Sequence, residues 1–235
     1  MKNSWLIILL VLLFALIVLE LILGTVTIDI IKGFKEFNSV DGNILESRLI
    51  RASVSVLVGA SCGLAGLGIQ TLFKNPLAGP TTLGVNSGAS LGVGIFYLIP
   101  GVSMQMEWLG LSFFAVLGAL AFLFLLIVVA GKSLNLTFVL IVGLLLSYAS
   151  YAILEVLLQL SDSVGIKSYV FWGMGSFNRA NVHSLIALLL VSVMGFVVMK
   201  KYATWLNIYS LGDTELKLLT RKSITFNKRL LLIVF

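Results

Sequence analysis

Six long apolar runs recur along the chain, and their length constrains the fold more than any other feature of the sequence. They cover about Ser4–Leu23, Ala52–Phe73, Thr82–Ile99, Trp108–Ala130, Leu136–Leu160 and Val182–Met199. Each run is close to the roughly 20 residues that a helix needs to cross a bilayer. The chain of 235 residues is 59% hydrophobic and 11% charged, whereas a soluble domain carries about a quarter charged residues. The sequence therefore predicts an all-α polytopic membrane protein.

Several shorter segments lie outside these runs. The charged stretch 24–46 predicts a loop with a short interfacial helix, and Trp172–Ser176 predicts a short re-entrant helix on the outer side. Leu211–Lys222 carries acidic residues early and basic residues late, as the helix dipole favours, and predicts an amphipathic cytoplasmic helix. Leu230–Phe235 is apolar but far too short to span, so we expect it to be the start of a seventh membrane helix.

Lysine and arginine predict the orientation of the chain. With the N-terminus inside, the inner loops hold Lys2, Lys74, Lys132 and the seven basic residues of Lys200–Arg229, ten in all against six outside. Cytoplasmic loops carry an excess of these residues, so we expect a cytoplasmic N-terminus. Arg48 and Arg51 are exceptions on the outer side. They indicate either an acidic partner at that face or anchoring to lipid headgroups.

Two of the apolar runs contain a glutamate. A carboxylate in mid-membrane is costly and normally faces the interior of a helix bundle. Glu155, with Gln159 one turn later, is the clearest case, and it either pairs with a polar group or lines a cavity. Glu20 lies near the end of the first run, where it can reach the interface or form a pair.

The region after the second run combines a turn with polar and small residues. Asn75-Pro76 predicts a sharp break, because proline disfavours helix at the residue before it. Asn86, Ser87 and Gly88 then fall where the third run begins, so they either flank a watery pathway or cap the helix. Before the turn, Gly59, Gly63, Gly66 and Gly68 and the small residues around them predict a helix buried among other helices. The GxxxG pattern of Gly59 and Gly63 is by itself a weak signal.

The sequence offers little catalytic chemistry. Gly131-Lys-Ser133 resembles the end of a phosphate-binding loop, but Leu126 stands where that motif needs glycine, so we do not expect a nucleotide site. His183 and Cys62 are the single histidine and cysteine, so we expect neither a metal or haem centre nor an intramembrane enzyme. The net charge of +6 is explained by membrane topology rather than by nucleic-acid binding.

Five stretches together resemble the permease subunits of the iron-chelate (siderophore or haem) and cobalamin ABC importers, the type II importers. Arg48-Leu-Ile-Arg51 is similar to the family's Arg-Leu-Pro-Arg, with Ile50 in place of proline. The other four are the glycine-rich helix Gly59–Gln70 with Phe73-Lys-Asn-Pro-Leu-Ala78, Leu83-Gly-Val-Asn-Ser-Gly-Ala89, Phe171-Trp-Gly-Met-Gly-Ser176 and Ser210-Leu-Gly-Asp213. The resemblance covers essentially the whole chain.

The resemblance implies a homodimeric permease with about ten helices in the cytoplasmic membrane of a prokaryote. Residues 1–235 would form one transmembrane permease domain that lacks the family's last helices. A cytoplasmic ABC ATPase dimer would use the ATP, an extracytoplasmic binding protein would deliver the substrate, and this chain would bind no cofactor. Arg48 and Arg51 would dock the binding protein. The remaining candidates are Gln70, Asn86, Ser87, Gly88, Glu155 and Gln159 for the pathway, and Asn75, Pro76, Gly212, Asp213 and Glu215 for the ATPase-facing surface.

A second function stays open from the residues alone. An ion-coupled secondary transporter could use Glu155 and the broken start of the run at Thr82–Ile99. Such folds often carry inverted repeats with interrupted helices, and no convincing internal repeat is present. A requirement for ATP rather than for an ion gradient separates the two functions.

Overall fold

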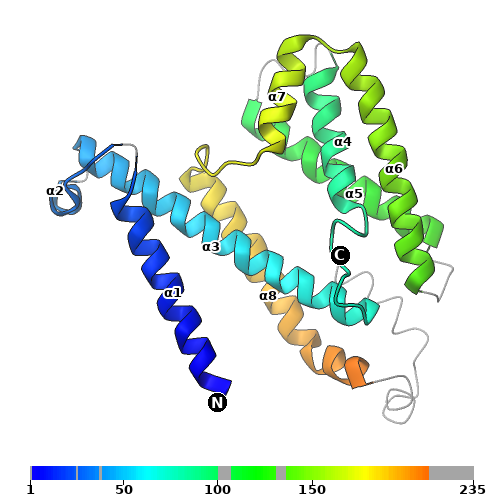
Figure 1. Ribbon diagram of the computed structural model, residues 1–235, viewed down its shortest axis with the longest axis horizontal. Helices are drawn as coiled ribbons and strands as arrows, with labels where there is room; N and C mark the ends of the chain where they lie inside the picture. Colours follow the sequence, from blue (N-terminus) through cyan, green and yellow to red (C-terminus); the bar gives the residue numbers. More distant parts are fainter. Residues whose placement is uncertain (1, 25, 37–38, 100–106, 131–135, 212–235) are drawn as a thin grey trace. The chain divides into compact units, whose positions relative to one another are not determined.

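The structure of the chain, a computed structural model, describes residues 2–24, 26–36, 39–99, 107–130 and 136–211. Within these residues it is helical, with no strand (Figure 1). The helices are α1 (Lys2–Ile22), α2 (Ile30–Lys35), α3 (Val40–Phe73), α4 (Val85–Leu98), α5 (Glu107–Ala130), α6 (Leu136–Leu160), α7 (Ser163–Gly173) and α8 (Val182–Leu211). The predicted all-α class is confirmed.

Five helices in the described residues are long and apolar enough to cross a membrane. Their spanning segments are Ser4–Ile22, Val40–Phe73, Gly110–Val129, Leu136–Leu160 and Val182–Ser210. The remaining predicted run, Thr82–Ile99, contains α4, which has only 14 residues. At 1.5 Å per residue it is about 21 Å long, shorter than the roughly 30 Å of a bilayer's hydrocarbon core.

The beginning of α3 differs from the sequence-based boundary. The apolar run predicts a start at Ala52, but the helix begins at Val40. The Ser39 hydroxyl accepts a hydrogen bond from the backbone N–H of Gly42 at 3.1 Å, which is the N-cap arrangement. Since hydropathy reports only the apolar part of a helix, this polar beginning was missed. Arg48 and Arg51 therefore lie inside a helix and not ahead of one.

Two further boundaries are corrected. The short helix expected at Trp172–Ser176 is α7, which begins at Ser163 and ends at Gly173. The Asp162 carboxylate caps its start by accepting from the N–H of Gly165 at 3.0 Å. The last helix, α8, continues past the predicted end at Met199 to Leu211. The helix predicted over Leu211–Lys222 and the apolar run Leu230–Phe235 lie outside the described residues, apart from Leu211 itself.

The chain divides into two compact units. The first consists of Met1–Cys62 and Ser176–Gly195, and the second of Gly63–Gly175 and Phe196–Phe235. In the first unit, the buried residues Leu45 and Arg48 of α3 face the segment that follows α1. The same unit joins α3 to α8 through the hydroxyls of Ser61 and Ser192, whose oxygens lie 2.8 Å apart.

The second unit has an apolar core between the end of α3, the turn after it, and α5, α6 and α8. Its buried members are Ile69, Leu72, Phe73, Ala78, Leu83, Leu126, Val139, Val142 and Leu206. The turn leaves α3 at Lys74, which has a positive φ of 48°. The ammonium group of Lys74 lies 4.6 Å from the centre of the Tyr209 ring, within reach of a cation–π interaction.

Close helix packing in this unit depends on glycines of α4 and α5. A Cβ atom on Gly92 would collide with the backbone carbonyl of Phe114, and one on Gly118 would collide with the carbonyl of Gly88. Small residues permit this approach of two backbones, which drives packing in lipid. At Gly59 and Gly63 of α3, by contrast, no described atom lies within 4 Å of an added Cβ. Among the described residues, the predicted burial of this helix among others is therefore absent at Gly59 and Gly63.

Candidate functional site

The guanidinium of Arg48 is built into the end of α1. It is 3% exposed and donates to the carbonyl oxygens of Leu21 at 2.7 Å, Ile22 at 3.3 Å and Val26 at 2.5 Å. The last carbonyls of a helix lack partners within the helix, and a cation there also interacts favourably with the helix dipole. Arg48 therefore caps α1 and connects it to α3.

Gly24 makes room for this cap. A Cβ atom on Gly24 would lie 2.7 Å from Cζ of Arg48 and 3.2 Å from its Nε, which is closer than van der Waals contact allows. A residue without a side chain is thus needed where the chain leaves α1. The buried guanidinium and the glycine beside it form one structural unit.

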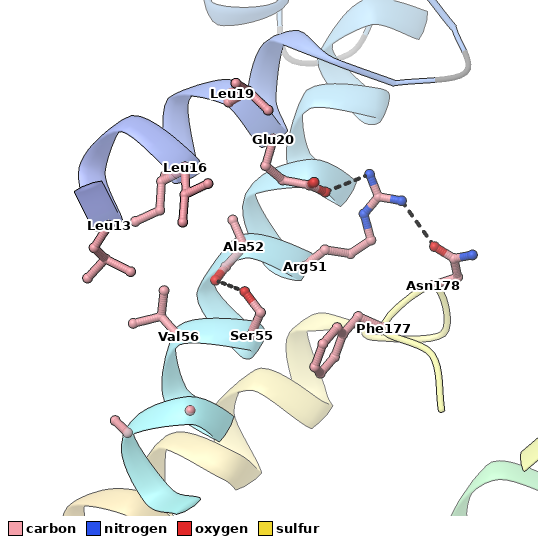
Figure 2. Close-up of a pocket in the computed structure, with 13 residues that line it drawn as sticks. Leu13, Leu16, Leu19, Glu20, Arg51, Ala52, Ser55, Val56, Phe177 and Asn178 are labelled. Carbon is pink, nitrogen blue, oxygen red and sulfur yellow. Dashed lines mark hydrogen bonds and ion pairs between the residues drawn. The ribbon is translucent and has the colours of Figure 1, made fainter. Parts of the chain in front are cut away.

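Arg51 lies one turn later on α3 and has different partners. Its Nη2 lies 3.2 Å from the Oε1 atom of Glu20 in α1, and its Nη1 donates to Oδ1 of Asn178 at 3.1 Å. Figure 2 shows the guanidinium between these two side chains. The side chain of Arg51 is 31% exposed, and that of Glu20 is 45% exposed. Unlike Arg48, this arginine is accessible.

A groove of about 780 Å³ between α1 and α3 ends at these charged groups (Figure 2). Most of its wall is apolar, and its polar end is formed by Glu20, Arg51, Ser55 and Asn178. The apolar lining consists of Leu13, Leu16, Ile17, Leu19, Ala52, Val56, Gly59, Ala60 and Phe177. The groove and the ion pair both lie within the first unit.

The candidate pathway residues at the start of α4 have two kinds of surroundings. Asn86 is exposed, whereas Ser87 and Gly88 are buried. A Cβ atom on Gly88 would meet the carbonyl of Gly118 at 2.7 Å, so this glycine is part of the α4–α5 packing. The packing gives Gly88 a structural role, and a role in lining a pathway stays a prediction for all three residues.

Glu155 and Gln159 are exposed on α6. The buried positions of this helix include Ser147, Ser150 and Leu154, which face the rest of the second unit. Within the described part of the chain, Glu155 forms no ion pair. The expected alternative of an internal pair is therefore absent there, and the lining of a cavity stays a prediction.

The candidate ATPase-facing residues fall partly within the described structure. Asn75 and Pro76 follow Gln70, a candidate for the pathway, which is exposed near the end of α3 and whose carbonyl accepts from the N–H of Asn75 at 3.2 Å. The Asn75 side chain accepts from the N–H of Leu77 at 2.9 Å, which closes the turn around the exposed Pro76. The predicted residues Gly212, Asp213 and Glu215 lie outside the described residues.

Sequence reasoning missed the partners of the two arginines. Glu20 was expected to reach the interface or pair, but its partner was not identified, and Asn178 was not singled out. The spacing of Arg48 and Arg51 gave no sign that one is buried and the other exposed. A signal existed in Gly24, because a glycine directly after an apolar run is common where a helix ends.

The fold defines a class of protein, a polytopic helical membrane protein. A solved structure, of a transporter assigned to the metal-chelate ABC type in an inward-facing conformation, matches with a TM-score of 0.80 and 26% identity. The match covers 99% of this chain and 72% of that one. The model of the FecCD transport family matches residues 10–233. This chain belongs to the FecCD transport family.

Curated relatives agree with this membership. The vitamin B12 import system permease protein BtuC of Photorhabdus laumondii is 33% identical over 174 residues, which is 73% of this chain and 51% of that protein. The hemin transport system permease protein HmuU of Yersinia pestis is 31% identical over 178 residues, with 73% and 52% covered. The chain thus spans about half the length of the curated relatives it matches. The resemblance inferred from the motifs is confirmed.

Proposed function

We propose that this chain is the permease subunit of an ATP-driven importer that moves an iron chelate, either a siderophore or haem, or cobalamin across the cytoplasmic membrane. The observation that carries the proposal is the family match over residues 10–233. Relatives named as vitamin B12 and hemin permeases support the substrate class. The apolar helices support a location in the membrane.

The proposed assembly has further members. Two copies of the permease would enclose the path, a cytoplasmic ATPase dimer would hydrolyse ATP, and an extracytoplasmic binding protein would deliver the substrate. The chain itself would bind lipid but neither a cofactor nor nucleic acid. The N-terminus would lie in the cytoplasm, as the ten inner and six outer basic residues favour.

In this proposal the two arginines have separate tasks. Arg51 would bind an acidic side chain of the binding protein, which is supported by its partly exposed side chain. Arg48 would hold α1 against α3, because its guanidinium donates to carbonyl oxygens at the end of α1 and in the segment just after it. Docking through Arg48 itself would require those hydrogen bonds to break. The structure therefore favours Arg51 as the contact residue.

The other candidates keep their proposed regions. The path would be lined or gated by Gln70, Asn86, Ser87, Gly88, Glu155 and Gln159. For α6 this is supported by the exposure of Glu155 and Gln159 on an apolar helix. The turn at Asn75-Pro76, with Gly212, Asp213 and Glu215, would face the ATPase. The charge of Glu155 would be tolerated because it faces water or protein in the complete permease.

The test is uptake by intact cells. A strain from which the gene is deleted is compared with its parent for uptake of radiolabelled cobalamin, haem and a ferric siderophore, each at low external concentration. We expect the deletion to abolish high-affinity uptake of one of these and to spare the others, with recovery from a plasmid copy. Unchanged uptake of all three would contradict the proposed substrate class.

A further inference from the structure

The ion pair of Arg51 and Glu20 does not use the full binding capacity of the guanidinium. Glu20 contacts Nη2 through one oxygen, Asn178 accepts from Nη1, and the buried Nε has no hydrogen-bond partner among the described residues. Arginine binds a carboxylate most strongly through two parallel hydrogen bonds. The arrangement at Arg51 is monodentate, so a better-placed carboxylate could replace Glu20.

Because the pair is exposed, breaking it to replace Glu20 costs little free energy. Both side chains of the pair reach solvent, at 31% for Arg51 and 45% for Glu20. Exposed pairs contribute little to stability because water and salt screen them. A carboxylate presented by a docked protein would be more strongly desolvated, and its hydrogen bonds to the guanidinium would be correspondingly stronger.

We propose that Glu20 is an internal competitor for Arg51, and that docking of the binding protein exchanges the Glu20 carboxylate for an acidic side chain of the partner. Before docking, the Glu20 carboxylate pairs with the Arg51 guanidinium and lowers the affinity of that guanidinium for other carboxylates. After docking, Glu20 is released from α3. This inference rests on the proposed docking role of Arg51.

The exchange would also change contacts between other segments of the first unit. Arg51 connects three segments, since Glu20 belongs to α1, Arg51 to α3 and Asn178 to the loop before α8. That loop holds its own shape, because the N–H of Asn178 donates to the Ser176 hydroxyl at 3.1 Å. Loss of the Glu20 contact therefore frees the Glu20 side chain, while Arg48 still holds the backbone at the end of α1.

Replacing Glu20 with glutamine tests the competition. Glu20→Gln keeps the size of the side chain and removes its charge, so the affinity for the binding protein should rise by about two- to fivefold, the factor that corresponds to a surface ion pair. Arg51→Gln should abolish binding. Because Glu20 acts through Arg51, the double variant should bind as poorly as Arg51→Gln alone. Glu46→Gln is the matched control, since it removes an exposed carboxylate of α3, the helix of Arg51, that does not contact Arg51.

The measurement is surface plasmon resonance of the full chain in lipid nanodiscs against the purified substrate-binding protein from the source organism, loaded with its substrate. Tighter binding by Glu20→Gln but not by Glu46→Gln, lost in the double variant, supports the exchange. Loss with Arg51→Gln but no change with Glu20→Gln would overturn the exchange and leave docking intact. Equal binding by wild type and Arg51→Gln, or no binding by wild type, would overturn both the docking role and the exchange.

Discussion

The Arg48 guanidinium in α3 donates to the carbonyl oxygen of Leu21, at the end of α1, over 2.7 Å. This bond joins two helices whose sequences are separated by a charged connection, and it is reinforced by bonds to Ile22 and Val26. Along the rest of its described length, α1 is mostly exposed. Its position in the first unit therefore depends heavily on its C-terminal end.

Replacing the capping arginine should be costly. Arg48→Gln removes buried, charge-assisted bonds and leaves carbonyls of α1 unpaired, so we expect a loss of about 2–3 kcal/mol in the free energy of unfolding. The matched control is Arg51→Gln, which removes a partly exposed pair and should cost less than about 1 kcal/mol. Unfolding in mixed micelles, followed by circular dichroism as the fraction of denaturing detergent rises, gives both values. Equal losses would contradict the separate roles.

The contact between Ser61 and Ser192 predicts a cross-link. With the native Cys62 changed to serine, the variant Ser61→Cys, Ser192→Cys should form a disulfide on mild oxidation, because the hydroxyl oxygens lie 2.8 Å apart. Ser55→Cys paired with Ser192→Cys is the control and should not react, since Ser55 lies about 9 Å further along the helix. Mass spectrometry of tryptic fragments identifies the bond. Equal cross-linking of both pairs would show that α3 and α8 are not fixed in this register.

Close packing of α4 on α5 predicts that replacing Gly92 lowers the stability of the protein. Gly92→Ala places a methyl group against the Phe114 carbonyl, and overpacking of this kind costs about 1–3 kcal/mol. In Gly63→Ala the added methyl group meets no described atom within 4 Å, so the helix propensity of alanine should leave stability unchanged or raise it by up to about 1 kcal/mol. The same detergent titration measures both variants. A tolerated Gly92→Ala would contradict the α4–α5 contact.

Backbone conformation and packing predict that replacing Gly84 costs more stability than replacing Gly175. Gly84 and Gly175 have positive φ angles of 80° and 70°. A side chain at Gly84 would also press on Phe122, 2.6 Å away, whereas Gly175 has open space around it. Gly175→Ala should cost the strain alone, about 1–2 kcal/mol, and Gly84→Ala should cost clearly more. Their melting temperatures in detergent, measured by tryptophan fluorescence, test the order, and the reverse order would contradict the packing at Gly84.

Much of the fold could be predicted from the sequence, because long apolar runs report directly on the helices that cross lipid. Hydropathy does not register the polar continuations of a helix. The sequence-based boundaries therefore missed the start of α3 at Val40 and the end of α8 at Leu211. The start at Val40 depends on the Ser39 cap, a local hydrogen bond that hydropathy does not register.

The candidate site was only partly predictable for a different reason. A motif identifies Arg48 and Arg51 together, but burial depends on which segment folds over each side chain. The chain after α1 covers Arg48 and leaves Arg51 accessible. Similarly, GxxxG spacing at Gly59 and Gly63 indicates where close packing is possible, but not where a partner helix lies.

The energy source of transport tests the proposed function most directly. Right-side-out membrane vesicles from the parent and deletion strains are loaded with ATP or with buffer, and uptake of the substrate identified in cells is measured with its binding protein outside. We expect uptake that requires both this gene and internal ATP, stops with internal vanadate and persists when a protonophore collapses the ion gradient. Gene-dependent uptake that needs no ATP and is abolished by the protonophore would contradict an ATP-driven importer.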